Sequence, residues 1–282
     1  MKKIEESGKN IKVDFQDASG DQTAMATMLQ SFVDKEYDLV VPMLTPPAIA
    51  AATTCADIPM IFMSVTEPVY AKLLTDMDQP TDMITGTSNR IPAEISLAAA
   101  ETLTPSDGKT CVIMYNADQV NAVATKDGAV AYCEANGIKY EEKAYTDINT
   151  ALQIAQSLSK DDTAYVYVAL DSTIANNFNQ VGEALKEAQI PSYTAAGAMV
   201  TGGGAFSFSI DYAEIGEMTA DMVLAWYDGT PLSELPVQRV EDFTLVYNTD
   251  VIAALGIDEA DVTAYADSVG LPSQAVETVT AE

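Results

Sequence analysis

Apolar and polar positions alternate along the chain in blocks that predict strands followed by helices. Residues 38–44 and 58–65 are short, almost continuous apolar runs, and a segment of helical character follows each of them. Short apolar strands that alternate with helical segments are typical of βαβ units, in which the strands form a parallel sheet. The first part of the chain is therefore predicted to build one such sheet.

A second series of the same kind begins after residue 90. A helix is predicted over 121–136, and Gly137 gives its stop signal. Either Asn149 or Thr150 is expected to cap a further helix over 151–159. The other predicted elements are strands at 110–115, 138–145, 163–170, 190–195 and 205–210, helices at 173–188 and from 213 onward, and an extended crossing segment at 235–248.

The two series predict an α/β protein of two lobes, each a parallel sheet flanked by helices, joined by strands that cross back and forth. A chain of 282 residues suits two lobes better than one domain. We expect residues 1–90 and 212–235 to form lobe 1, N-terminally incomplete, and residues 91–211 and 236–257 to form lobe 2. Residues 258–282 carry no base and predict a loosely attached acidic tail.

Charge and composition exclude several classes of function. The formal net charge of −28 argues against a nucleic-acid partner, because phosphate binding needs clustered Lys and Arg. The chain contains no histidine, which removes the commonest general base and most zinc sites. We therefore expect no enzymatic activity, no metal and no cofactor.

No run of eighteen apolar residues is present, and no apolar segment follows the basic N-terminus, so neither a membrane span nor a secretory signal is predicted.

The three cysteines do not form a metal or redox motif. Cys55, Cys111 and Cys133 are an odd number, and no CxxC spacing occurs. Free cysteine often behaves as a small buried hydrophobe, which is the role expected here. A bridge between Cys111 and Cys133 remains open from the sequence.

Small polar residues follow five of the predicted strands. In parallel α/β sheets, ligands bind at the carboxyl ends of the strands, where helix N-termini present free N–H groups. Hydroxyls and amides suit a carboxylate, and a carboxylate suits a cation, so the combination fits a zwitterion such as an amino acid. Each residue, taken alone, also suits a helix cap. The candidate ligand-binding residues are Thr45, Ser64, Thr66, Asn116, Asn121, Asp171, Ser172, Thr173, Asp211 and Tyr212.

Five stretches of the chain resemble one known family: AAATTCADIPMIFMSVTEPVYAKLL, ITGTSN, CVIMYNADQVNA, YVYVALDSTIANN and AFSFSIDYAEIGEMTADMVLAWYDGTPLSELPV. They resemble the ABC-transporter substrate-binding proteins associated with tryptophan and tyrosine uptake, which have the type 1 periplasmic-binding-protein fold. The resemblance runs from about residue 8 to about residue 257. It implies a hinge of three crossing segments, a solute in the cleft, a membrane permease as partner, a monomer, and an extracytoplasmic location in the periplasm or as a membrane-anchored lipoprotein.

The resemblance also implies how the ligand is held. The carboxylate of an aromatic amino acid would bind amides and hydroxyls, and its ammonium would bind Asp171 or another carboxylate. The chain departs from the pattern at Glu67, where relatives usually carry Asp, and over Tyr193–Val200, which is more apolar than in relatives. Relatives begin with a strand and a helix before the position that matches Gly8, so the chain is expected to lack both.

Two other classes of function stay open from the sequence. A ligand-sensing domain of a regulator would use the same fold, but it needs a helix-turn-helix in the same chain, and none is predicted. An α/β enzyme would need catalytic groups other than histidine. Fold alone does not fix function.

Overall fold

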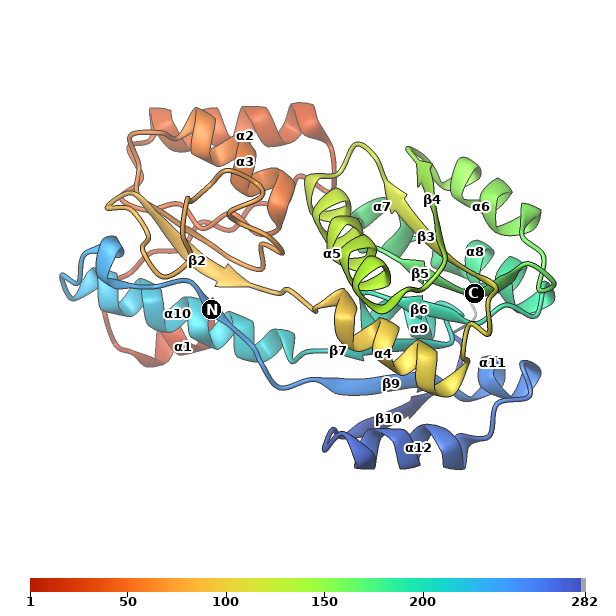
Figure 1. Cartoon of the computed structure of the whole chain (residues 1–282). Helices are drawn as coiled ribbons and strands as arrows, with labels where there is room; N and C mark the ends of the chain where they lie inside the picture. The colour runs from red at the N-terminus through yellow and green to blue at the C-terminus, as the bar shows by residue number, and fades with distance from the viewer. Residues whose placement is uncertain (280–282) are drawn as a thin grey trace. The chain divides into compact units, whose positions relative to one another are not determined.

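The computed structural model describes residues 1–279 and divides the chain into two compact units. Unit 1 consists of Met1–Arg90 and Asp211–Glu241, and unit 2 consists of Ile91–Ile210 and Asp242–Glu282. The chain thus passes from one unit to the other three times, and neither unit is continuous in sequence (Figure 1). The unit boundaries differ from the expected lobe boundaries at residue 211 and at residues 236–241, which are expected in lobe 2 but belong to unit 1.

Unit 1 contains a three-stranded parallel sheet in the order β1-β2-β8. The strand predicted at 38–44 forms only isolated bridges, Val40 with Met60 and Met43 with Met63. Pro42 has no N–H for the ladder, which limits the pairing there. The elements of the unit are α1 (Lys2–Glu6), α2 (Gln22–Asp34), α3 (Thr45–Thr54), β1 (Met60–Phe62), β2 (Ile84–Ser88), α10 (Tyr212–Tyr227), the 3-10 helix η1 (Leu232–Glu234) and β8 (Gln238–Arg239).

Helices α2 and α3 pack against each other in unit 1, while α10 contacts β1 and β2 and carries α1 on its side. The two strands approach each other tightly at Gly86. A Cβ atom there would lie 2.1 Å from the carbonyl oxygen of Phe62. β1 and β2 can therefore pack this closely only because residue 86 is a glycine.

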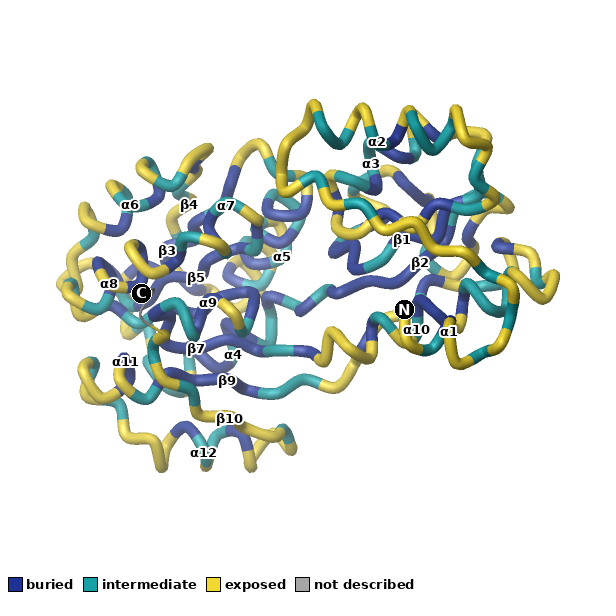
Figure 2. Tube along the Cα trace, turned by 180° about the vertical axis from the view of Figure 1, so that it is seen from behind, coloured by how far each residue is buried: buried dark blue, intermediate teal, exposed yellow. Residues whose placement is uncertain are grey.

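Unit 2 contains a seven-stranded sheet in the order β10-β9-β7-β6-β5-β3-β4. All neighbouring pairs are parallel except β7 with β9, so the expectation of a wholly parallel sheet is wrong at this pair. Figure 2 shows the central strands as buried segments. The strands are β3 (Thr110–Asn116), β4 (Tyr140–Tyr145), β5 (Thr163–Val168), β6 (Ser192–Thr194), β7 (Phe206–Ser209), β9 (Thr244–Asn248) and β10 (Ser273–Val276).

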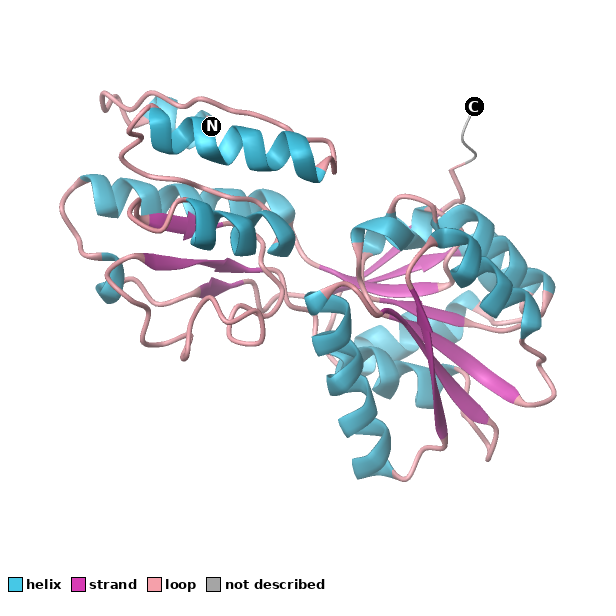
Figure 3. Ribbon diagram, turned by 90° about the horizontal axis from the view of Figure 1, so that it is seen from above, coloured by secondary structure: helices cyan, strands magenta, loops and turns pink. Residues whose placement is uncertain are grey.

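The helices of unit 2 lie on both faces of its sheet (Figure 3). Helices α6 and α8 pack together over the face that buries Val112, Met114, Val166 and Val168, whereas α4 packs against α5 and α12. The helices are α4 (Ala93–Leu103), α5 (Val120–Asn136), α6 (Ile148–Ser157), α7 (Ser172–Ala175), α8 (Phe178–Glu187), α9 (Gly197–Thr201), α11 (Thr249–Ala254) and α12 (Glu259–Ser268).

The predicted bounds of three helices of unit 2 agree with the structure to different degrees. Helix α5 ends at Gly137, whose left-handed backbone (φ 67°) is the expected stop. Helix α6 begins earlier than predicted, because the carboxylate of Asp147 accepts a hydrogen bond from the Thr150 N–H and caps it in place of Asn149 or Thr150. The single helix predicted at 173–188 is wrong: the chain breaks at Asn177 into α7 and α8.

The part of the predicted acidic tail that the structure describes, residues 258–279, is not loosely attached, and residues 280–282 lie outside the described residues. Asp258 caps α12, and this helix buries Val262 and Ala266 completely. After α12 the chain forms β10, which pairs in parallel with β9 at the edge of the sheet of unit 2. The absence of bases in this segment gave no information about the apolar positions that anchor it.

Candidate functional site

Two neighbouring strand ends of unit 2 bring predicted site residues together. Strands β3 and β5 pair in parallel, so their carboxyl ends lie at the same edge of the sheet. Asn116 is the last residue of β3, and Asp171 follows β5. The Asn116 Nδ2 donates a hydrogen bond to Asp171 Oδ1 at 3.3 Å, and both side chains are 1% exposed. Two of the predicted residues are therefore in direct contact.

The Asp171 carboxylate organises this edge. Its Oδ1 also accepts the backbone N–H groups of Thr173 at 2.7 Å and Ile174 at 3.1 Å, which makes Asp171 the N-cap of α7. Its Oδ2 accepts the hydroxyl of Tyr145 at 2.5 Å. A carboxylate has about four lone-pair positions. Oδ1 is fully occupied by three donors, while Oδ2 has one donor.

Tyr145 is a member of this cluster that the sequence analysis did not single out. It ends β4, the strand on the other side of β3, and it is 1% exposed. Burial and the negative charge of Asp171 raise the pKa of the Tyr145 hydroxyl well above its ordinary value. The hydroxyl therefore stays protonated and remains a hydrogen-bond donor to Asp171 through the neutral pH range.

Asn121 lies in the first turn of α5, beside the same strand ends. Its Nδ2 donates to the carbonyl of Leu170 at 2.7 Å. Its Oδ1 is buried and has no hydrogen-bond partner among the residues that the structure describes. A buried acceptor without a partner is costly, so this oxygen is a position where an external donor would be favoured.

Unit 1 repeats the arrangement at the ends of β1 and β2. Ser64 and Thr66 follow β1, and Asn89 directly follows the parallel strand β2. The Thr66 hydroxyl donates to Asn89 Oδ1 at 3.0 Å, and the Ser64 N–H donates to Thr87 Oγ1 at 3.2 Å. Ser64 has a left-handed backbone (φ 60°), and its buried Oγ has no partner within residues 1–279.

An ion pair lies next to this turn. The Arg90 Nε is 2.6 Å from Glu67 Oε1, and both side chains are partly exposed. The Glu67 carboxylate therefore has a guanidinium partner in the turn that follows Thr66. Asn89 and Arg90 were missed by the sequence analysis, although Asn89 ends the stretch ITGTSN and occupies the same position after a strand as the chosen residues.

The other predicted site residues occupy helix starts. Thr45 is buried at the start of α3, next to Leu44, whose N–H donates to the carbonyl of Met63 just before Ser64. Ser172 is exposed and Thr173 partly buried in α7. Asp211 caps α10, and it is exposed together with Tyr212. Both belong to unit 1, whereas residue 211 was expected in lobe 2.

Metal-holding groups of acidic, cysteine or histidine side chains and bilayer-spanning helices are both absent from the described residues. Over residues 1–279, no three His, Cys, Asp or Glu side chains are grouped so as to hold a metal ion. In the same part of the chain, no helix has both the length and the apolar character needed to cross a bilayer.

Comparison with known proteins identifies the family. The model of the family described as "ABC transporter substrate binding protein" matches residues 2–269. The chain belongs to this family. Its α/β architecture is that of the type 1 periplasmic binding proteins, as predicted.

Three relatives illustrate the similarity. The tyrosine-binding protein of Clostridioides difficile (strain R20291) is 29% identical over 254 residues, which are 89% of this chain and 72% of the relative. The structure of an ABC domain in complex with L-Trp, from Streptococcus pneumonia, is 28% identical with a TM-score of 0.83, covering 98% of this chain and 93% of that one. A ligand-free, open substrate-binding protein with adhesive properties from Clostridium difficile is 28% identical with a TM-score of 0.75, covering 99% and 92%.

Proposed function

We propose that this chain captures an aromatic amino acid, with tyrosine and tryptophan as the leading ligands, for an ABC uptake transporter. The observation that carries the proposal concerns two buried oxygens, Ser64 Oγ and Asn121 Oδ1. Neither has a partner among the described residues, and each lies beside the carboxyl ends of parallel strands of its own unit. The Streptococcus pneumonia relative in complex with L-Trp and the relative named for tyrosine binding support the aromatic class.

The available groups suit both ends of an amino acid. The Ser64 hydroxyl can donate to a carboxylate, and the Asn121 Oδ1 can accept from an ammonium or from an N–H group. Asp171 supplies the nearest buried negative charge to Asn121 in unit 2, and its Oδ2 has a single donor. Charge-assisted hydrogen bonds of this kind are about twice as strong as neutral ones. The proposed roles, with each unit taken by itself, are therefore Ser64 in unit 1 as a donor toward a carboxylate, and Asn121 with Asp171 in unit 2 as acceptors toward an ammonium.

The proposal includes the setting in which the chain acts. It would work outside the cytoplasm, deliver its ligand to a membrane permease, and carry out no chemical step on that ligand. Family membership supports this role. The lack of histidine is consistent with binding without catalysis.

Isothermal titration calorimetry with L-Tyr, L-Trp, L-Phe, L-Leu and L-Glu tests the proposal directly. We expect saturable binding of at least one aromatic amino acid, and binding of L-Leu and L-Glu that is weaker by tenfold or more. Heat from L-Leu or L-Glu alone would retain amino-acid binding but contradict the aromatic preference. No heat with any of the five would contradict the proposed ligand class.

The variants Ser64→Ala and Asn121→Ala assign the binding residues. Each is expected to weaken binding of the aromatic ligand by about 1–3 kcal/mol, since each removes one buried hydrogen bond to it. Ser106→Ala is a matched control, because its hydroxyl has its own intramolecular partner in Glu101. Unchanged affinity in both variants would contradict the assignment while leaving ligand capture intact.

A further inference from the structure

Cys111 and Cys133 are brought together by the geometry of a single βα unit in unit 2. Cys111 is the second residue of β3, and Cys133 lies in the last turn of α5. Because a helix that follows a strand runs back along it, the start of the strand meets the end of the helix. The two cysteines are therefore paired by the topology although they are far apart in sequence.

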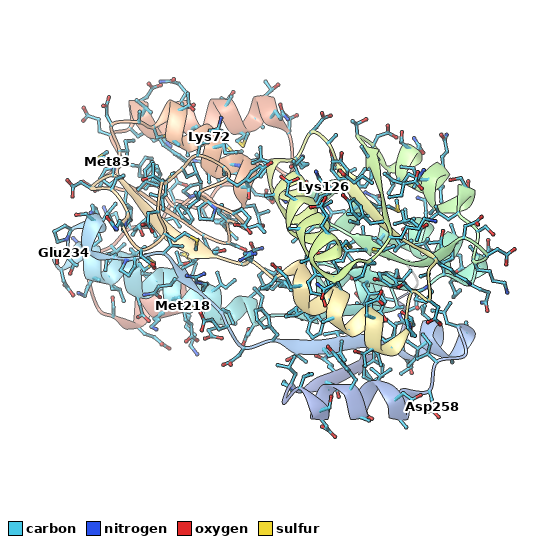
Figure 4. All side chains as sticks on the ribbon, viewed as in Figure 1. Lys72, Met83, Lys126, Met218, Glu234 and Asp258 are labelled. Atoms are coloured by element: carbon cyan, nitrogen blue, oxygen red, sulfur yellow. The ribbon has the colours of Figure 1, made fainter. Side chains whose placement is uncertain are left out.

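The side-chain pattern shows which faces meet. The odd-numbered positions of β3 share one face, and Tyr115 on that face has the Lys126 ammonium at 5.3 Å from its ring centroid. Lys126 is carried by α5 (Figure 4). Helix α5 turns a buried stripe toward the sheet. That stripe consists of Ala122, Thr125, Ala129 and Cys133. The contact of Lys126 with Tyr115 near one end of the unit places Cys133 opposite Cys111 at the other end.

The two thiols lie in the same buried layer between β3 and α5. Both residues are 0% exposed, and each thiol is among the groups that shift the pKa of the other. The interaction with Cys111 lowers the pKa of the Cys133 thiol, whereas the interaction with Cys133, together with burial, raises the pKa of Cys111. The third cysteine, Cys55, is buried in unit 1 and hydrogen-bonds the carbonyl of Leu29 at 3.6 Å.

We propose that Cys111 and Cys133 are a disulfide-forming pair that closes the β3–α5 unit when the chain folds with a small-molecule disulfide as oxidant. The thiolate of Cys133 attacks one sulfur of oxidised glutathione, so a mixed disulfide forms and one glutathione thiolate leaves. The thiolate of Cys111 then attacks the Cys133 sulfur and releases the second glutathione. The protein loses two thiol protons and two electrons, and glutathione disulfide is reduced to two thiols.

The bond would fix the end of the unit that lies opposite the candidate site. Asn116 ends β3 and Asn121 begins α5, so both are carried by the strand and helix that the bond would join. A disulfide restricts the unfolded chain and adds stability when its geometry is unstrained. The proposal does not depend on ligand capture, because it concerns the thiols alone.

Mass spectrometry with thiol alkylation tests the pair. The full chain is unfolded with reductant, refolded in a glutathione redox buffer, denatured and alkylated. We expect one alkylated cysteine instead of three, a mass lower by two hydrogens than that of the reduced chain before alkylation, and a linked peptide pair containing Cys111 and Cys133. The oxidised chain should melt at a higher temperature than the same sample after reduction.

Two variants make the outcome specific. Cys55→Ala should leave the linked pair intact, whereas Cys111→Ala should leave Cys133 free or joined to glutathione and should abolish the melting-temperature difference. Because both thiols are buried, the natively purified chain is also incubated with oxidised glutathione in urea near its unfolding midpoint and then diluted before alkylation, so that a failure to refold from full denaturation does not decide the result. Three alkylated cysteines in a chain with a cooperative melt, or a link that involves Cys55, would overturn the proposal.

Discussion

Tyr145 donates a 2.5 Å hydrogen bond to Asp171, and this bond reaches across the end of a strand that lies between them. The strand order is β5-β3-β4, so Tyr145 at the end of β4 and Asp171 beyond β5 flank Asn116 at the end of β3. Asn116 itself donates to Asp171. One buried carboxylate therefore ties together the ends of three parallel strands.

Replacing Tyr145 by Phe should destabilise unit 2. The variant removes the only donor that Asp171 Oδ2 has within residues 1–279 and leaves this oxygen buried, which should lower the free energy of unfolding by about 1–3 kcal/mol in urea denaturation. Tyr140→Phe on the same strand is the matched control, because its hydroxyl bonds Glu134 in an exposed position. Its effect should be within about 0.5 kcal/mol. Equal losses in the two variants would contradict the importance of the buried bond.

Two substitutions of Asp171 distinguish its role as the cap of α7 from the role of its negative charge. Asp171→Ala removes the cap of α7 and leaves Asn116 Nδ2 unpaired, so the free energy of unfolding should fall by about 2–4 kcal/mol. Asp171→Asn keeps an acceptor for the cap and should cost less. Urea denaturation of both variants and of the parent chain measures the two losses of unfolding free energy. A larger loss for Asp171→Asn than for Asp171→Ala would contradict the proposed capping role.

The same variants test the proposed role toward the ligand ammonium. Calorimetry on folded Asp171→Asn should show aromatic-ligand affinity reduced by about 1–3 kcal/mol, because the negative charge is lost. Asp147→Asn is the control, since Asp147 also caps a helix of unit 2 but is exposed. Unaltered affinity in Asp171→Asn would assign the residue a structural role only.

Thr87 supports the turn that carries Ser64. Its Oγ1 accepts the Ser64 N–H at 3.2 Å and shares a 2.9 Å hydrogen bond with Thr219, and the residue is fully buried. Thr87→Val should lower the free energy of unfolding by about 1–3 kcal/mol in chemical denaturation, because both partners lose a bond. The exposed Thr27→Val on α2 serves as control, and a comparable loss there would refute the explanation.

Gly86 and Gly216 make a contrasting pair within unit 1. An added Cβ at Gly86 would lie 2.1 Å from the backbone oxygen of Phe62, so Gly86→Ala should destabilise the protein by about 3 kcal/mol or prevent folding of the unit. Gly216 lies within α10 with no atom within 4 Å of that position, and Gly216→Ala should stabilise by about 0.5–1 kcal/mol. Thermal melts of the two variants should shift in opposite directions.

The sequence predicted most of the fold because the central strands β3 and β5 of unit 2 are almost wholly buried and are therefore apolar runs. Gly137 likewise marked a helix end through its backbone conformation. The errors have local causes. Pro42 interrupts pairing within an apolar run, and the break at Asn177 separates two helices whose apolar residues continue the same spacing. The prediction of a loose acidic tail is wrong for α12 because the apolar side chains of Val262 and Ala266 anchor a helix whose other positions are largely charged or polar.

The candidate site was only partly predictable. Reading the residue after each strand found Asn116 and Asp171, which the structure brings into contact. It did not find Tyr145, because a tyrosine at the end of a polar strand is not distinguishable from a surface residue until the strand order is known. It also did not indicate that Asp171 has four donors within the protein, since this depends on two backbone N–H groups and on a neighbouring strand.

The discontinuity of unit 1 imposes an order on its biosynthesis. Ile61 of β1 packs against Met222 of α10 and Leu232 of η1. As the ribosome delivers the chain from the N-terminus, that apolar face has no cover until residues 91–210 of the other unit have been made. The contiguous strands β3 to β7 can pair during this interval. The first part of unit 1, in contrast, keeps its apolar surface exposed until α10 and η1 have been synthesised. Nascent unit 1 is therefore the part of this protein that most needs protection from aggregation before synthesis is complete.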